Sequence, residues 1–98
     1  MAGYLIANYR ITDAAAYEAY PPAVIPTLMA HGAEVLVADY ESEAVEGKPA
    51  SVTIVLKFPS KEAVRAWYDS PEYQQIVGLR TENSEGFVVF ADGFVMPA

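Results

Sequence analysis

Arg80 is the residue in this sequence best suited to hold a charged ligand. It follows Tyr73 by seven positions and Ile76 by four, a spacing that places all three on one side of a helix. That side is apolar, so the guanidinium group needs a partner for its fork of N–H donors. A carboxylate or enolate ligand would be such a partner, and Arg80 is then also a candidate catalytic residue. The alternative is a structural role, in which an acidic side chain or carbonyl groups near the helix end satisfy the guanidinium.

Several aromatic side chains occur in segments that are expected to enclose a space between helices and sheet. They are Tyr9, Tyr17, Tyr20, Trp67, Tyr68 and Tyr73. Aromatic walls suit flat organic molecules, and tyrosine hydroxyls can fix the orientation of a bound ligand. The candidate ligand-binding residues are Arg80, Tyr73, Trp67, Tyr17, Tyr9 and Asn8. The alternative for each aromatic residue is a place in the core with its polar atom reaching the surface.

His31 and Asn8 are the other polar residues considered for a site. His31 is the sole histidine, and its side chain titrates near neutral pH by default, so it is a candidate general base. Its place before Gly32, at a predicted helix end, favours a capping role instead. Asn8 lies on the strand face opposite the predicted core. Its amide could bind a ligand there, or the same residue of a second subunit, which we favour.

The composition argues against several other kinds of site. The sequence has no cysteine, so disulfides, thiolate metal sites and a cysteine nucleophile are excluded. One histidine with scattered acidic residues gives neither metal-ligand spacing nor a credible Ser-His-Asp set. No glycine-rich phosphate loop is present. We therefore expect neither a metal nor a cofactor.

Length and charge narrow the class of protein. The chain has 98 residues, of which 53% are hydrophobic, which indicates a single domain over 1–98 with a real core. Its net charge is −7, and six basic residues are scattered singly, so binding to nucleic acid or to anionic lipid is not expected. The N-terminus shows no signal peptide and no apolar run is long enough to span a bilayer. A soluble cytoplasmic protein is the prediction.

Hydrophobic patterning and turn residues predict the elements that position these side chains. Strands are expected over 4–11, 34–40, 51–58 and 87–95. A helix over 14–30 should start at Thr12 or Asp13, bend or restart near Pro22, and close at His31-Gly32. Ser60 should cap a further helix, which Ser70-Pro71 restarts and which continues to about Thr81.

The order strand-helix-strand occurs twice, which predicts an α+β, ferredoxin-like βαββαβ fold. Its four-stranded antiparallel sheet should carry helices on one face. Leu5, Ala7 and Tyr9 alternate toward that face. The opposite face also carries apolar side chains, such as Ile6 and Val55, where a solvated face would be more polar. We therefore predict a homodimer in which the second sheet covers this face.

A set of local motifs follows the same plan. They are Ile11-Thr12-Asp13, Tyr17-Glu18-Ala19-Tyr20, Pro26, His31-Gly32, Glu46-Gly47, Phe58-Pro59-Ser60, Tyr68-Asp69-Ser70-Pro71-Glu72-Tyr73 and Leu79-Arg80. With these motifs, nearly the whole chain resembles the domain-of-unknown-function family 1330, within the dimeric α/β barrel superfamily. The resemblance implies two subunits whose sheets lie face to face, with the helices outside. The Ser-Pro-Glu-Tyr run with its downstream arginine is the most specific part.

The chain departs from the family pattern in two places. Lys57 stands before Phe58 where the family often has a glutamate, so an acid role there is not available. Asp39-Tyr40 replaces a basic, glycine-rich stretch after the second strand, which weakens any anion-site interpretation of that corner.

The resemblance leaves two functions open. Relatives in the superfamily include cofactor-free monooxygenases, small-ring isomerases and proteins with no known activity. One hypothesis is therefore a small-molecule-binding barrel, with cofactor-independent chemistry of the oxygenase or isomerase type on a small planar or acidic compound. The other is a non-catalytic structural or stress-associated dimer without an active site. A cavity bordered by Arg80 and at least two tyrosine hydroxyls would favour the first, and an Arg80 ion pair within the protein would favour the second.

Overall fold

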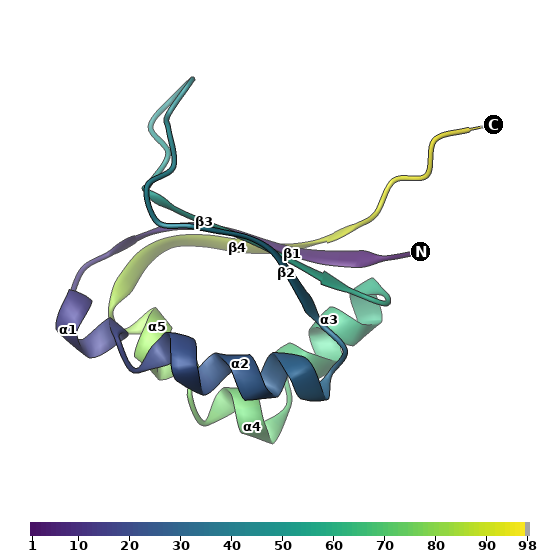
Figure 1. The fold of residues 1–98 in the computed structure, drawn as a ribbon, viewed down its shortest axis with the longest axis horizontal. Helices are drawn as coiled ribbons and strands as arrows, with labels where there is room; N and C mark the ends of the chain where they lie inside the picture. The colour runs from purple at the N-terminus through teal and green to yellow at the C-terminus, as the bar shows by residue number, and fades with distance from the viewer. Residues whose placement is uncertain (98) are drawn as a thin grey trace.

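The computed structural model describes residues 1–97 as an antiparallel sheet with helices packed against one face (Figure 1). The strands are β1 (Gly3–Ile11), β2 (Glu34–Asp39), β3 (Val52–Phe58) and β4 (Ser84–Asp92), and their order in the sheet is β2-β3-β1-β4. The helices are α1 (Ala14–Tyr17), α2 (Tyr20–Ala30), α3 (Lys61–Tyr68), α4 (Pro71–Gln74) and α5 (Gly78–Thr81). This architecture confirms the predicted α+β, ferredoxin-like fold.

Polar caps define the helix starts, as the sequence predicts. The side chain of Asp13 accepts a hydrogen bond from the Ala16 backbone N–H at 3.1 Å, so Asp13 is the residue that caps α1. Ser60 does the same for α3 and Ser70 for α4. At the end of α2, Gly32 takes a left-handed backbone conformation with φ of 68°, which only glycine adopts at little cost.

The proline-containing helix restarts as expected. The first segment ends at Tyr17, and α2 begins at Tyr20, so that Pro21 lies in its first turn, where a missing N–H costs nothing. Pro26 is accommodated inside α2. The restart lets Tyr17 and Tyr20 both point into the molecule, and both are buried.

Two predicted boundaries are wrong. The helix expected to run from Ser70 to Thr81 is split, because α4 ends at Gln74 and α5 begins at Gly78. The last strand was expected over 87–95 but spans Ser84–Asp92. Its pairing with β1 extends through Gly86, which pairs with Tyr9 and has no room for a side chain against the backbone of Asn8.

The core lies between the sheet and the helices. Its buried hydrophobic members are Leu5, Ala7, Tyr9, Tyr17, Tyr20, Val24, Leu28, Val52, Leu56, Phe58, Val64, Trp67 and Tyr73. The alternation predicted for β1 and β3 is therefore confirmed, since every second residue of each strand faces the helices.

Two segments project from the layered body. The connection between β2 and β3 rises above the sheet on the side away from the helices, and so does the chain after β4 (Figure 1). Val45 in the connection is 85% exposed, and Phe94 after β4 is 80% exposed. Within residues 1–97 no helix has the length and apolar character required to cross a bilayer.

Candidate functional site

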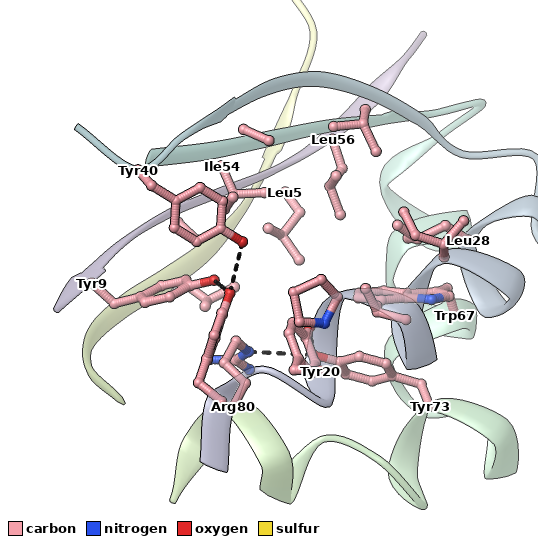
Figure 2. A pocket seen from close by; sticks show the side chains of 18 residues that line it. Leu5, Tyr9, Tyr20, Leu28, Tyr40, Ile54, Leu56, Trp67, Tyr73 and Arg80 are labelled. Atoms are coloured by element: carbon pink, nitrogen blue, oxygen red, sulfur yellow. Dashed lines mark hydrogen bonds between the residues drawn. The ribbon is translucent and has the colours of Figure 1, made fainter. Parts of the chain in front are cut away.

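A cavity of about 250 Å³ lies between the sheet and the helices (Figure 2). Its lining residues come from all four strands and from α1 to α5: Leu5, Ala7, Tyr9, Tyr17, Tyr20, Pro21, Val24, Ile25, Leu28, Val35, Ala38, Tyr40, Ile54, Leu56, Trp67, Tyr73, Arg80 and Val88. Ala7 and Ala38 place only methyl groups on the sheet side, which leaves room above them. Apart from Arg80, the other lining residues have aliphatic or aromatic side chains.

Tyrosine hydroxyls form one hydrogen-bonded chain at one end of the cavity. The Tyr17 hydroxyl lies 2.6 Å from that of Tyr9 and 3.1 Å from that of Tyr40. Tyr9 comes from β1, Tyr17 from α1, and Tyr40 follows β2, so three separate elements meet here (Figure 2). Tyr40 is 42% exposed, so this chain of hydroxyls reaches from the buried core to the surface.

A second pair of hydroxyls lies beside Arg80. The Tyr20 and Tyr73 hydroxyls are 2.8 Å apart, and Arg80 Nε donates to the Tyr73 oxygen at 3.4 Å. The guanidinium carbon also lies 6.0 Å from the centre of the Tyr9 ring, within the range of a cation–π contact. The half-buried Arg80 side chain is therefore surrounded by phenol groups.

The proton count of these hydroxyls leaves donors free. Tyr9, Tyr17 and Tyr40 carry three O–H protons between them, and the two hydrogen bonds that join them use two. Tyr20 and Tyr73 carry two O–H protons, and the hydrogen bond between them uses one. The bond from Arg80 to Tyr73 uses neither, because Arg80 is its donor. Each network thus has one O–H to offer, and Arg80 has N–H groups beyond Nε. The site is rich in donors and poor in acceptors.

Burial fixes the protonation of these groups. It raises the pKa of Tyr17 and Tyr20 well above the ordinary tyrosine value, and it also raises the pKa of Tyr9, although the Tyr17 hydrogen bond opposes this. For Arg80, burial acts to lower the pKa, but the Tyr73 hydroxyl opposes it and the net pKa is raised. At neutral pH Tyr9, Tyr17 and Tyr20 are therefore uncharged donors, and Arg80 is a cation.

The lining contains no group that accepts a proton readily. Of the described residues around the cavity, none is Asp, Glu, His or Lys, and Arg80 alone is charged. Arg80 also has no carboxylate within ion-pair distance among residues 1–97. The ion pairs found there lie elsewhere, at Arg10–Glu85, Lys61–Asp92 and Arg65–Asp69. What this arrangement can do is bind negative charge and stabilise it.

The structure brings most of the predicted site residues together. Arg80, Tyr73, Trp67, Tyr17 and Tyr9 all line the cavity. The Trp67 ring stacks on that of Tyr73 with centres 4.0 Å apart, and its Nε1 donates to Thr27 at 3.0 Å, so it forms wall and core at once.

The remaining sequence candidates lie away from the cavity. Asn8 is on the opposite sheet face, where its amide donates to the Ala50 and Val52 carbonyls at 3.0 Å and accepts from the Ala50 N–H at 2.8 Å. These contacts occupy its polar atoms within its own chain. His31 ends α2 and does not line the cavity, and Tyr68 does not line it either.

Tyr40 is the residue that sequence reasoning missed. Ala38 and Tyr40 alternate toward the helices, so the period of two in β2 was a signal for Tyr40. The signal was obscured by the irregular register between Val35 and Val37.

Solved structures share this fold at low sequence identity. A protein of unknown function from Rhodopseudomonas palustris aligns with a TM-score of 0.78 and 15% identity, covering 97% of this chain and 84% of that chain. A dimeric ferredoxin-like protein of unknown function from Bacteroides fragilis aligns with a TM-score of 0.64 and 11% identity, covering 94% and 96%. An antibiotic biosynthesis monooxygenase aligns with a TM-score of 0.54 and 17% identity, covering 97% and 100%. These likenesses establish the fold alone.

Comparison at the level of sequence gives the family. Among curated proteins, no significant match to the chain was found. The model of the family described as "Domain of unknown function (DUF1330)" matches residues 2–94, which includes every element of the fold and all the cavity residues, from Leu5 to Val88. The motif resemblance is thereby confirmed, and the chain belongs to the DUF1330 family.

Proposed function

We propose that this protein binds a small organic acid in the cavity, with Arg80 holding the anionic group and the tyrosine hydroxyls fixing its orientation. The observation that carries the proposal is the isolation of the Arg80 charge. A half-buried cation that is surrounded by neutral phenol and apolar groups is costly unless an anion compensates its charge, and no carboxylate within residues 1–97 does so. A bound carboxylate or enolate would supply the missing charge.

The donor count supports the same class of ligand. A carboxylate accepts several hydrogen bonds, and the site offers two phenol O–H groups beside the remaining guanidinium N–H groups. A cationic ligand would find like charge and few acceptors. We therefore assign Arg80, Tyr73 and Tyr17 to ligand binding, with Trp67 and Tyr9 as flat walls.

Any chemistry at this site would use the same groups to stabilise charge that develops on the ligand, such as an enolate oxygen. The fold likeness to a monooxygenase is consistent with a cofactor-independent reaction of that kind. The lack of a carboxylate or imidazole in the described lining favours the alternative, a binding protein without a catalytic step. His31, outside the cavity, is not proposed as a base.

We also propose that two copies associate through the open sheet face. The strand register places Val37, Val55, Ile6 and Val89 in one row across all four strands on this face. Val89 is 46% exposed and Phe87 is 54% exposed in the protomer, which is unusual for a solvated sheet face. The dimeric solved structure of similar fold supports this association.

A thermal-shift screen of small aromatic and aliphatic acids tests the binding proposal. The wild type and Arg80→Met are compared, with Arg65→Met as a matched control, because Arg65 is a 62% exposed side chain paired with Asp69 outside the cavity. Acids should raise the melting temperature of the wild type and of Arg65→Met but not of Arg80→Met. An unchanged ligand shift in Arg80→Met would overturn the role of Arg80.

A further inference from the structure

We infer that the ligand is a single-headed acid with an apolar tail, on the order of eight to ten non-hydrogen atoms in all, whose tail lies toward Leu28 and Leu56 while its carboxylate lies at Arg80. This inference rests on the proposed function and deepens it by naming the substrate class. It follows from the fact that the cavity is polar at one end only.

The long direction of the cavity follows β1. Tyr9, Ala7 and Leu5 alternate along one face of this strand and all three line the cavity. At roughly 3.3 Å per residue, Tyr9 and Leu5 are about 13 Å apart along the strand. The lining therefore changes from a phenol through a methyl group to an aliphatic side chain over this length.

The opposite wall shows the same change. Tyr20, Val24 and Leu28 are four residues apart on α2, and all are buried lining residues. At about 1.5 Å per residue, Tyr20 and Leu28 are separated by about 12 Å along the helix axis. Tyr17 joins the polar ends of the two walls, because its hydroxyl lies 2.6 Å from that of Tyr9 and its ring centre lies 5.6 Å from that of Tyr20.

The far end of the cavity has no polar group left for a ligand. Leu5 pairs with Leu56 across the sheet, and Leu56 pairs with Val35, so the sheet side is aliphatic there. Trp67 Nε1 already donates to the Thr27 hydroxyl, which in turn donates to the Val24 carbonyl at 2.7 Å.

Within residues 1–97, no buried side-chain nitrogen or oxygen lacks a partner. A second polar group on the ligand would therefore be buried without a hydrogen bond, which is unfavourable.

The volume sets the size of the ligand. A water molecule takes roughly 30 Å³ in the liquid, so a cavity of about 250 Å³ holds on the order of eight to ten non-hydrogen atoms. Straight-chain monocarboxylates of six to eight carbons and aryl-substituted short acids have this size and this single polar end. Dicarboxylates, sugar acids and amino acids do not.

A series of monocarboxylates tests the inference, with Trp67 fluorescence as the readout because Trp67 is the sole tryptophan and lines the cavity. Acids of four to twelve carbons and the eight-carbon dicarboxylate suberate are titrated below their micelle concentrations. Affinity should rise about threefold to fourfold per added CH₂ and then level off near eight carbons. Suberate should bind at least tenfold more weakly than octanoate.

Substitutions at the tail end sharpen the test. Leu28→Phe should shorten the preferred chain by about two carbons, and Leu28→Ala should lengthen it. Met29→Phe is the matched control, because Met29 is the next residue of α2 and is 75% exposed, so the preferred length should not move. If Leu28→Phe fails to fold, the preferred chain length of Leu28→Ala still tests the inference.

The outcomes separate the two claims. If acids bind and depend on Arg80, but suberate binds as well as octanoate or affinity is independent of chain length, the tail assignment is wrong and the proposed function survives. If no acid of the series binds although other acids of the thermal-shift screen do, the tail assignment is wrong and the proposed function survives. If no acid binds in either experiment, the proposed function itself fails. If Leu28→Phe and Met29→Phe behave alike, the tail does not lie at Leu28.

Discussion

The two faces of the sheet carry side chains of the same kind in very different surroundings. On the helix side, Val52 and Phe58 are each 1% exposed. On the other side, Val89 remains 46% exposed and Phe87 54% exposed, although both come from the middle of a strand. Hydrophobic alternation thus identifies two apolar faces but does not state what covers each of them.

The covered face differs in a second way, because it is not completely filled. Trp67 of α3 packs against Phe58 of β3, with ring centres 5.5 Å apart. The space above Ala7 and Ala38, by contrast, is not filled by side chains. The charge of Arg80 lies at this opening. We propose that this partly open space on one face holds a small molecule and that the other face packs against a second subunit.

Truncation in the covered face should have the largest effect on stability. Trp67→Ala removes a 1% exposed ring that stacks on Tyr73 and hydrogen-bonds to Thr27, so the free energy of unfolding should fall by about 3–5 kcal/mol. Phe87→Ala on the open face should cost less than half as much at protein concentrations low enough to keep the protomers separate, because Phe87 is 54% exposed in the protomer and no closed void forms there. Urea unfolding followed by circular dichroism measures both, and equal losses would contradict the contrast between the faces.

A charge on the open face should separate the subunits. Val89→Asp places a carboxylate in the apolar row formed with Ile6 and Val55, which a dimer would have to bury. Light scattering should report twice the 10.6 kDa protomer mass for the wild type and the protomer mass for Val89→Asp. Met29→Asp, at a 75% exposed position of α2 on the helix side of the sheet, should remain dimeric. A wild type that is monomeric at micromolar concentration would rule out this association.

Loss of the Asn8 amide should have a smaller effect, confined to the open face. Asn8→Ala removes the hydrogen bonds to Ala50 and Val52 that fasten the start of β3, and stability should fall by about 1–3 kcal/mol. Acid binding should stay within twofold of the wild type, because the cavity is on the other side of the sheet. A tenfold loss of acid affinity with normal folding would place Asn8 in the site after all.

Alkaline pH should produce the smallest effect. Because burial raises the pKa of Tyr20, the folded state keeps its proton at a pH where the unfolded chain releases it, above about pH 10. The contribution of Tyr20 to the free energy of unfolding is therefore fully present below about pH 10. It falls as the pH rises further, by about 1.4 kcal/mol per pH unit for a single tyrosine of this kind. Urea unfolding at pH 8 and pH 11 should show a smaller loss in Tyr20→Phe than in the wild type, and identical losses would contradict the assigned direction.

Sequence patterns predicted the fold well because local signals agreed with it. Ser60 and Ser70 cap helices, and Gly32 has a left-handed conformation. The sequence shows each of these three as a residue type that is typical of an element end. The start of β4 was not predicted because Gly86 is a poor strand former. Glycine is needed at this position since a side chain would clash with the backbone of Asn8.

The cavity could be predicted only in part, because its residues meet through tertiary contacts. Helical spacing predicted that Arg80 and Tyr73 lie together, and Arg80 Nε does contact Tyr73 even though the helix is split between them. No local pattern shows that Ala7 and Ala38 face the same space from two different strands. Tyr40 joins the hydroxyl chain from the residue directly after β2, a strand whose register is irregular, so its place could not be predicted from spacing alone.

The most direct measurement is calorimetric titration of the wild type with a matched pair, octanoic acid as its anion and octanamide. The two ligands have the same tail and nearly the same size, and they differ in the charge presented to Arg80. If Arg80 is a cation that lacks an anion, the carboxylate should bind at least tenfold more tightly than the amide. Equal affinities would contradict the account, because the cavity would then be selecting for apolar surface and not for charge.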